Sequence, residues 1–360
     1  MAYIPPTSHI TLLATLRRER LLPVPGEVLV AAGQHVETGD IVARAELADH
    51  HRLIDVARAL GVPREKAADF LTKAEGEQVK KGEPIAIRKT WLGLSTRREV
   101  SPVDGRLVFC DHGQALLAAI TSLEVRAGLP GTVVSVVSGR GVLIETAGAL
   151  LEGVWGNGRE DFSVLRALGD GPAAPLRAEQ LEPSMQGAIL AAGWLADAAA
   201  LQALAGLGVR GLILGTAPTE LLPSLQAAGF PVLVVDGFGQ AGFSAPAFAL
   251  VGGNSGREMW LSARPLDRQA GTRPEAIVPL PTSHEPPAPP LEGEPLQEGK
   301  RVRVVRGAEA GRVGTVIGLS DRPMPLPNGV RAHVAAVALD ETQGARPTVT
   351  VPFANLELLE

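Results

Sequence analysis

Residues 33–43 read GQHVETGDIVA and residues 76–86 read GEQVKKGEPIA, two copies of one pattern set 43 positions apart. Both fit Gly-x-x-Val-x-x-Gly-acid-x-(Val or Ile)-Ala. Each copy predicts a short strand with an apolar residue, a turn at the second glycine and a further strand. An internal repeat of this kind indicates two half-units that must pack together to bury their apolar faces.

The repeat lies in a β-rich region that extends from residue 20 to residue 150. After the second copy, residues 101–117 (SPVDGRLVFCDHGQALL) and 129–145 (LPGTVVSVVSGRGVLIE) each hold two glycines eight positions apart, between apolar runs. Apolar runs separated by turn residues are typical of hairpins. We therefore expect a region of repeated short hairpins.

The stretch between the two copies predicts a helical insertion over residues 50–73. Apolar residues recur at helical spacing over 53–60, and Gly61 provides a stop signal. His50 and His51 are then expected at the start of this helix. Adjacent helical residues point in different directions, so these two histidines make a poor metal-binding pair.

Residues 181–278 have a different pattern, in which short continuous apolar strands alternate with helices. This pattern is typical of βαβ units and a parallel sheet. It predicts a small three-layer α/β domain, with strands and helices alternating over 187–193, 196–208, 209–215, 219–229 and 230–239. The preceding residues 151–180 are interpreted as connecting hairpins.

The last part of the chain predicts a linker and a small barrel. Residues 279–297 contain seven prolines and no periodicity, which favours a semi-extended linker. Residues 298–360 contain four or five short strands and the hairpin signal Asn328-Gly329. With residues 1–19 as an N-terminal segment, the predicted fold class is multidomain α+β: a β-rich region, an α/β domain and a C-terminal small β-barrel.

Composition narrows the classes of function. The chain has 360 residues, of which 45% are hydrophobic and 20% charged, and its net charge of −5 gives no overall attraction to nucleic acid. Its apolar runs are too short for a membrane helix, so we expect no membrane partner. Cys110, the only cysteine, excludes an intramolecular disulfide and favours the cytoplasm. Scattered histidines and the lack of a GxSxG elbow predict no metal, no cofactor and no catalytic residue.

The repeat, taken with SPVDGRLV (101–108), resembles the barrel-sandwich hybrid, the fold of biotinyl and lipoyl carrier domains, over roughly residues 20–120. In carrier domains, a lysine at a hairpin tip takes the cofactor. Ten residues beyond Gly82, where that lysine would lie, the chain has Leu92, and the nearby Lys89 lacks methionine neighbours and an acidic partner. The resemblance therefore implies the fold without the carrier activity.

Residues 298–319, EGKRVRVVRGAEAGRVGTVIGL, resemble a KOW motif: a basic and apolar strand, a glycine turn and a second strand. Gly307, Gly311 and Gly314 hold the turn positions. KOW modules are small barrels that bind RNA or protein in ribosomal proteins and transcription elongation factors. The resemblance implies such a barrel, and a protein or nucleic-acid partner for residues 298–360.

The KOW-like segment also supplies the first group of candidate binding residues. Strand alternation would place Arg301 and Arg303 on one face and Val302 and Val304 on the other. Such a basic strip would contact phosphates, or would simply be a solvated face that protects an edge strand. The candidate residues of this strip are Lys300, Arg301, Arg303, Arg306 and Arg312.

A second group lies at the strand ends of the α/β domain, the usual ligand position in an open parallel sheet. The candidate residues are Gly193, Thr216, Thr219, Asp236 and Gly237. Three of them also have structural explanations. Thr219 would cap the helix that follows it, and Asp236 with Gly237 would form a turn.

These observations favour a non-catalytic binding or scaffolding protein, linked to nucleic acid, transcription or translation through its C-terminal barrel. One alternative is an enzyme subunit whose α/β strand-end loops bind a small anionic ligand. Another is a purely structural assembly protein, in which every domain is an interface. An oligomer is compatible with each of the three.

Overall fold

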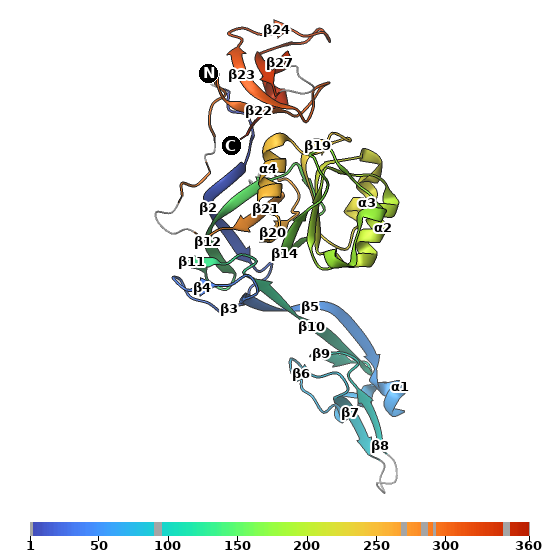
Figure 1. Ribbon diagram of the computed structural model, residues 1–360. Coiled ribbons are helices and arrows are strands. Elements are labelled where there is room, and N and C mark those ends of the chain that lie inside the picture. The colour runs from blue at the N-terminus through green and yellow to red at the C-terminus, as the bar shows by residue number, and fades with distance from the viewer. Residues whose placement is uncertain are drawn as a thin grey trace.

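A computed structural model describes residues 3–89, 96–267, 272–281, 287–290, 293–340 and 346–359 of the chain. Strands account for 48% of the protein and helices for 14%, so it is a β-rich α+β protein built from several sheets. In Figure 1, a C-terminal sheet lies at the top, a body that contains the α/β sheet lies in the middle, and a distal module hangs from a two-stranded arm.

The two sequence repeats adopt the same local structure. Each begins with a two-residue strand, turns at its second glycine and continues into a longer strand. The first copy forms β4 (His35–Val36) and the start of β5 (Ile41–Asp55), and the second forms β6 (Gln78–Val79) and β7 (Pro84–Lys89).

The pairing of the repeats is also the same. Val36 pairs with Gly131, and Val79 pairs with Gly105, both in antiparallel ladders. Both valines are buried. A Cβ atom at either glycine would lie 2.2 Å from a carbonyl oxygen of the neighbouring strand, so only glycine allows the strands to approach this closely.

One repeat unit is inserted into the other. The outer unit contains β3 (Glu27–Val28), β4, β11 (Gly131–Val137) and β12 (Gly141–Glu152). Between its strands, the chain leaves along β5 and returns along β10 (Gln114–Arg126), and the second unit lies at the far end of that pair. The repeat is therefore nested.

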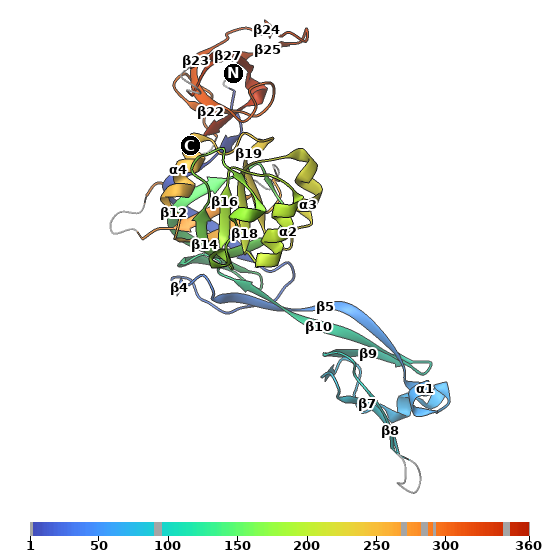
Figure 2. The same cartoon turned by 45° about the vertical axis from the view of Figure 1, so that its right-hand side comes forward.

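Strands β5 and β10 form the arm. They pair from Asp55 with Gln114 at the distal end to Ile41 with Arg126 at the body, with two register shifts on the way. Figure 2 shows this ribbon leaving the body, with little else around its middle. Over its middle part the arm is thus held by its own ladder.

The distal module has a core of its own. It contains α1 (Val56–Leu60), the 3₁₀ turns η1 (Arg64–Lys66) and η2 (Ala68–Phe70), β6, β7, β8 (Thr96–Val100) and β9 (Gly105–Asp111). Val56, Leu60, Ile85, Leu107 and Leu117 are completely buried within it. The module therefore has the internal packing of a small folding unit.

The prediction of a helix from residue 50 is wrong for its first six residues. His50 and His51 lie in β5, where they pair with β10. The helix begins only at Val56, because the carboxylate of Asp55 accepts the amide N–H of Arg58 and caps it, and Gly61 ends it with φ of +64°. Before Asp55, the pairing of β5 with β10 outweighs the helical spacing of the apolar residues.

The N-terminal segment is not a separate element. Strand β1 (Thr7–Ser8) pairs in parallel with β28 (Leu356–Leu359) of the C-terminal sheet, and β2 (Ile10–Leu21) pairs along β12. Residues 1–19 thus join the C-terminal sheet to the body, apart from the first two residues, which lie outside the described range.

The α/β domain follows the predicted order. The parallel strands run β19, β18, β16, β14 across the sheet, and one helical segment follows each of β16, β18 and β19. The bounds are β14 (Glu160–Ala167), β16 (Ile189–Ala192), α2 (Ala198–Leu207), β18 (Gly211–Ala217), η5 (Thr219–Leu221), α3 (Leu222–Gln226), β19 (Val232–Phe238), α4 (Ala245–Gly253), β20 (Glu258–Ser262) and β21 (Glu275–Pro279). The predicted strands and helices over 187–239 are therefore present.

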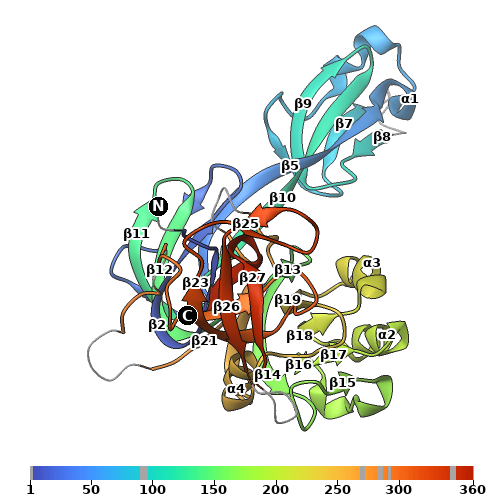
Figure 3. The ribbon, with the colours of Figure 1, turned by 90° about the horizontal axis from the view of Figure 1, so that it is seen from above.

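The region predicted as connecting hairpins belongs to this domain. Strand β13 (Trp155–Gly156) pairs with β19, and β14 pairs with both β16 and β20. Two short strands, β15 (Pro175–Leu176) and β17 (Trp194–Leu195), pair beside them, near the turns η3 (Ala178–Gln180) and η4 (Pro183–Met185). Figure 3 shows α2 and α3 on one side of the sheet and β12 with β2 on the other.

The C-terminal sheet has the strand order β1, β28, β22, β23, β26, β27. Its bounds are β22 (Arg301–Val304), β23 (Val313–Leu319), β26 (Val334–Leu339) and β27 (Thr348–Pro352), with η6 (Phe353–Asn355) before β28. A separate hairpin, β24 (Met324–Pro325) with β25 (Arg331–Ala332), turns at the predicted Asn328-Gly329 pair.

The proline-rich segment contacts the body where it is described. The amide N–H of Thr15 on β2 donates to the carbonyl of Ala288, and its hydroxyl donates to the carbonyl of Pro287. These bonds hold residues 287–288 against β2, so this stretch of the predicted linker is not a free spacer. Residues 282–286 and 291–292 of the linker lie outside the described residues.

Candidate binding surfaces

Two residues that the sequence assigned to different candidate sites meet at one buried junction. Asp236 lies at the end of β19, and Arg303 lies on β22 of the C-terminal sheet. The guanidinium Nη1 of Arg303 donates to Asp236 Oδ1 at 3.0 Å and to the carbonyl of Val235 at 2.9 Å. The Arg303 side chain is fully buried, and that of Asp236 is 1% exposed.

The junction also includes the chain ends. Arg303 donates to Glu357 on β28, at 2.6 and 3.2 Å, and to the hydroxyl of Ser8 on β1 at 3.1 Å. Arg273 donates to Glu357 from the other side at 2.8 Å. Because the donors and acceptors come from β1, β19, β22, β28 and the segment before β21, the network joins the α/β domain, the N-terminal segment and the C-terminal sheet.

A buried pair extends this network along the N-terminal segment. The amide N–H of His9 donates to Glu152 Oε2 on β12 at 2.9 Å, and His9 Nδ1 lies 3.0 Å from the same oxygen. The nearest approach of Arg273 to Glu152 is 3.9 Å. His9, which lies between β1 and β2, is thus hydrogen-bonded to β12 of the body.

Burial and charge pairing compete in this network. Burial disfavours the charge of Arg303, but Glu357 and Asp236 outweigh it and raise the pKa of the guanidinium. Burial would likewise raise the pKa of Glu357, but Arg303 and Arg273 lower it. Burial does raise the pKa of Asp236, because Arg303 and the amide of Ser244 offset only part of that cost.

The structure contradicts the prediction that Arg301 and Arg303 form one exposed basic strip. Arg303 does not share an exposed face with Arg301, because the face of β22 that carries Arg303 is covered by the α/β domain. Arg301 forms a two-pronged ion pair with Asp340, at 2.7 and 2.6 Å. Lys300 pairs with Glu294 and Arg312 with Glu309.

Arg306 is the exception among the five. It is exposed, and it has no hydrogen-bond or ion-pair partner among the residues that the structure describes. Four of the five candidate cations thus have carboxylate partners within the chain. This pairing lowers the positive potential that the sequence predicted for the segment 300–312.

The strand ends of the α/β sheet are filled by the chain itself. The Thr216 hydroxyl accepts the amide N–H of Gly242 at 2.9 Å. A Cβ atom at Gly193 would lie 2.5 Å from the carbonyl oxygen of Pro172, and one at Gly242 would lie 2.2 Å from the same oxygen. The loops that carry these residues therefore pack backbone against backbone where a ligand would be expected.

Thr219 and Gly237 complete that group, and Gly237 pairs with Thr216 across β18 and β19. Thr219 is exposed and is the first residue of η5, while the cap position belongs to Pro218 and has no side-chain hydrogen bond. The predicted capping role of Thr219 is therefore wrong. Asp236 and Gly237 lie within β19, so the predicted turn is wrong, and the φ of +142° at Gly237 explains the glycine by backbone conformation.

An arginine-lined cavity, which the sequence did not indicate, lies at the root of the arm. It has a volume of about 630 Å³ and is bounded by the end of β2, the end of β10, and β14 with β20 of the α/β domain. Its charged lining residues are Arg20, Glu124, Arg126, Glu160, Asp161, Arg210 and Arg264. The four arginines come from positions too far apart in sequence to form a motif.

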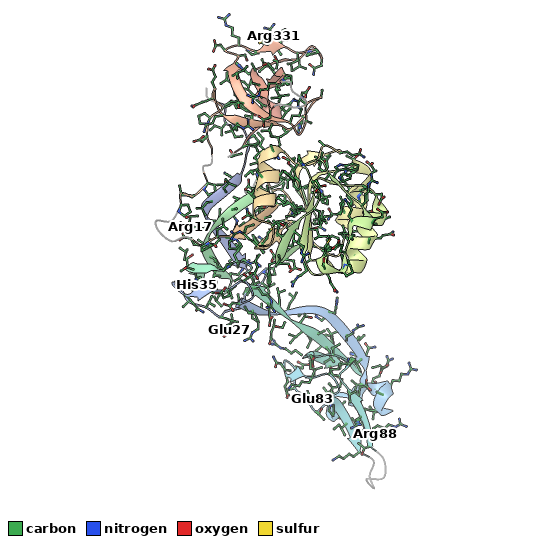
Figure 4. The ribbon with its side chains drawn as sticks, in the orientation of Figure 1. Arg17, Glu27, His35, Glu83, Arg88 and Arg331 are labelled. Carbon is green, nitrogen blue, oxygen red and sulfur yellow. The ribbon has the colours of Figure 1, made fainter. Side chains whose placement is uncertain are left out.

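A small ring cluster lies on the C-terminal sheet. The rings of His333 and Phe353 stack with centroids 5.7 Å apart, and the ring of Tyr3 lies 5.4 Å from that of Phe353. His333 is exposed. Arg331, two residues before His333, points outward from the same end of the molecule in Figure 4.

Within the described ranges, no group of three or more His, Cys, Asp or Glu side chains is arranged to hold a metal ion. Lys89 is the last residue of β7, and the carrier-lysine position at Leu92 lies outside the described residues. None of the described helices has the length and hydropathy to cross a membrane.

Comparison with known proteins does not add to this picture. No protein-family model matches the chain, and no curated protein matches it in sequence. The functional argument therefore depends on the geometry described above.

Proposed function

We propose that this protein is a non-catalytic scaffold that holds a distal binding module at a distance from a body with fixed joints. In this proposal, the nested units have a barrel-sandwich-like fold without a carrier role, and residues 298–360 form a KOW-like module. The observation that carries the proposal is the use of both candidate sites, Asp236 and Arg303, in one buried joint.

The joint supports a structural role, because burying the charge of Arg303 is unfavourable unless that charge is paired. A buried arginine needs partners for most of its donors, and here Asp236, Glu357, Ser8 and a carbonyl oxygen supply them. Such a network fixes one arrangement of the C-terminal sheet on the α/β domain. It also occupies the strand end at which the enzyme-subunit alternative would need its ligand.

The arm supports the presentation of a module to a partner. The distal module has its own buried core. Its outer sheet carries a row of apolar side chains across three strands, in which Leu116 pairs with Leu53 on one side and with Phe109 on the other. Leu53 is 58% exposed and Phe109 is 40% exposed. Exposed apolar side chains in register are typical of surfaces that bind other proteins.

Site-specific photo-crosslinking in the native host tests this proposal. A photoreactive phenylalanine analogue replaces Phe109 on the distal module or, as a control, Val164 on the body, which is 38% exposed. The proposal expects one reproducible partner protein from position 109 and none in common with position 164. Failure to crosslink any protein specifically from position 109 would contradict it.

A second candidate function, contact with single-stranded nucleic acid, is favoured by the ring cluster of Tyr3, Phe353 and His333. Bases stack on exposed aromatic rings, and nearby arginines contact phosphates. His333 and Arg331 provide both groups on one surface of the KOW-like module. This surface is distinct from the segment 300–312, whose cations are mostly paired.

Binding of single-stranded RNA across a salt series tests the second candidate. The double variant His333→Ala with Arg331→Gln should weaken binding by about 1–3 kcal/mol, the usual value of one stacked base, and should reduce the salt slope. Arg306→Gln, an exposed arginine of the same module, is the matched control. Equal affinity in the wild type and the double variant would exclude this surface.

A further inference from the structure

The cavity at the root of the arm lies where three parts of the chain meet. Arg20 comes from β2, Arg126 from the end of β10, and Arg264 follows β20 of the α/β domain. The cavity of about 630 Å³ is within the size range of small-molecule sites. It is thus the meeting point of the arm, the N-terminal strand and the α/β domain.

Arg20 is built into the wall of this cavity. Its side chain is 5% exposed, and it donates to both carboxylate oxygens of Glu160, at 2.7 and 3.0 Å, and to the carbonyl of Arg126 at 2.8 Å. Its guanidinium lies 5.4 Å from the ring centre of Trp260. A stacked and two-pronged arginine is held in one orientation.

Two of the other cations of the cavity are held less tightly than Arg20. Arg264 approaches Glu160 at 3.4 Å, and Arg126 approaches Glu124 only at 3.9 Å, although Arg126 Nη1 also donates to the carbonyl of Gly39 at 2.9 Å. The side chains of Arg126 and Arg264 are 54% and 49% exposed. These long contacts leave N–H donors near the cavity for which a better acceptor would compete.

The charge of the lining favours an anion. Four arginines face three carboxylates, and one of those carboxylates, Asp161, is already engaged by both prongs of Arg210. Apolar side chains complete the wall: Leu21, Pro23, Leu123 and Val125. The cavity therefore combines surplus guanidinium donors with an apolar surface.

We propose that this cavity binds a phosphorylated small molecule of nucleotide size. The phosphate oxygens would accept from Arg126 and Arg264, since guanidinium groups match phosphate geometry, and the rest of the molecule would contact the apolar wall. The ligand would join the root of the arm to the α/β domain. This site is separate from the distal surface and from the filled strand ends.

Calorimetric titration of the full chain tests the proposal, with pyrophosphate, ATP and adenosine as probes. ATP should bind with a Kd below about 1 mM, pyrophosphate more weakly, and adenosine most weakly of the three. Arg126→Gln and Arg264→Gln should each weaken ATP binding at least about tenfold. Arg257→Gln, an exposed arginine of the same domain outside the cavity, should leave it unchanged.

Two results would overturn the proposal. One is the absence of heat with both ATP and pyrophosphate at millimolar concentration in low salt. The other is binding that Arg126→Gln and Arg264→Gln leave within twofold of the wild type, or that Arg257→Gln weakens equally. A matched unfolding midpoint for each variant without ligand keeps loss of binding distinct from loss of fold.

Discussion

The joint at Arg303 and the cavity at Arg20 use the same residue types in opposite ways. At the joint, the guanidinium is completely buried and its acceptors lie within 3.2 Å. At the cavity, Arg20 is nearly as buried, but Arg126 and Arg264 beside it are about half exposed and their ion pairs are long. Arginine count does not distinguish a joint from a binding site; the geometry of the acceptors does.

The largest expected effect is at the joint. Arg303→Met would leave Asp236 buried without a cation and Glu357 with Arg273 alone, which should cost about 3–5 kcal/mol of unfolding free energy. The matched variant Arg301→Met, on the same strand, breaks an ion pair whose side chains are each 41% exposed, and should cost at most about 1 kcal/mol. Urea denaturation of both variants measures the difference.

Equal losses of unfolding free energy in Arg303→Met and Arg301→Met would contradict that comparison. If Arg303→Met destabilised the protein no more than Arg301→Met, the buried network would not be what holds the C-terminal sheet on the α/β domain. The fixed body of the proposed scaffold would then lack its joint.

A smaller cost is expected at the cavity wall. Arg20→Met keeps the apolar stem against Trp260 but removes both hydrogen bonds to Glu160, whose side chain is 35% exposed. Because water can still reach Glu160, the expected loss is about 2 kcal/mol, below that at Arg303. Thermal unfolding followed by circular dichroism measures it, and a loss above that of Arg303→Met would reverse the comparison.

The pH dependence of stability provides a third test. Glu357 has a pKa held below its ordinary value of 4.5 by Arg303 and Arg273, so its contribution is present above that value and is lost as the pH falls through the lowered pKa. The raised pKa of Asp236 contributes with the opposite sign. Glu357→Gln should therefore flatten the fall in unfolding free energy between pH 5 and 3, measured in urea.

The smallest effect is expected at Arg306. The residue is exposed and unpaired among the described residues, so Arg306→Gln should change the unfolding free energy by less than about 0.5 kcal/mol. As the control of the RNA-binding test, Arg306→Gln should keep the salt slope of the wild type. A larger change in stability would show a contact for this side chain that the static structure does not contain.

Short-range features of this fold were predictable from sequence. The glycine template correctly indicated strand, turn and strand in both copies, and the apolar strands of the α/β domain lie where the pattern placed them. Asn328-Gly329 forms its hairpin turn, with Gly329 at φ of +81°. Each of these depends on a few neighbouring residues.

Long-range features were not predictable. Strand alternation correctly set Arg303 opposite Val302, but which face the α/β domain covers depends on Asp236, 67 residues away. The ring cluster joins Tyr3 to Phe353, and the arm-root cavity joins Arg20 to Arg126 and Arg264. A single sequence has no local signal for such pairs, because each is fixed only when separate modules dock.

The pairing of β1 with β28 has a consequence for synthesis on the ribosome. Thr7 and its partner Leu358 are 351 positions apart, so Thr7 is made long before Leu358. At about 5–20 residues per second, roughly 20–70 s pass before the partner strand exists. The inserted distal module, whose core ends near residue 117, can form during that interval, whereas the C-terminal sheet must wait until β28 has been made. Newly made chains would thus carry a completed arm before β1 and β28 can pair.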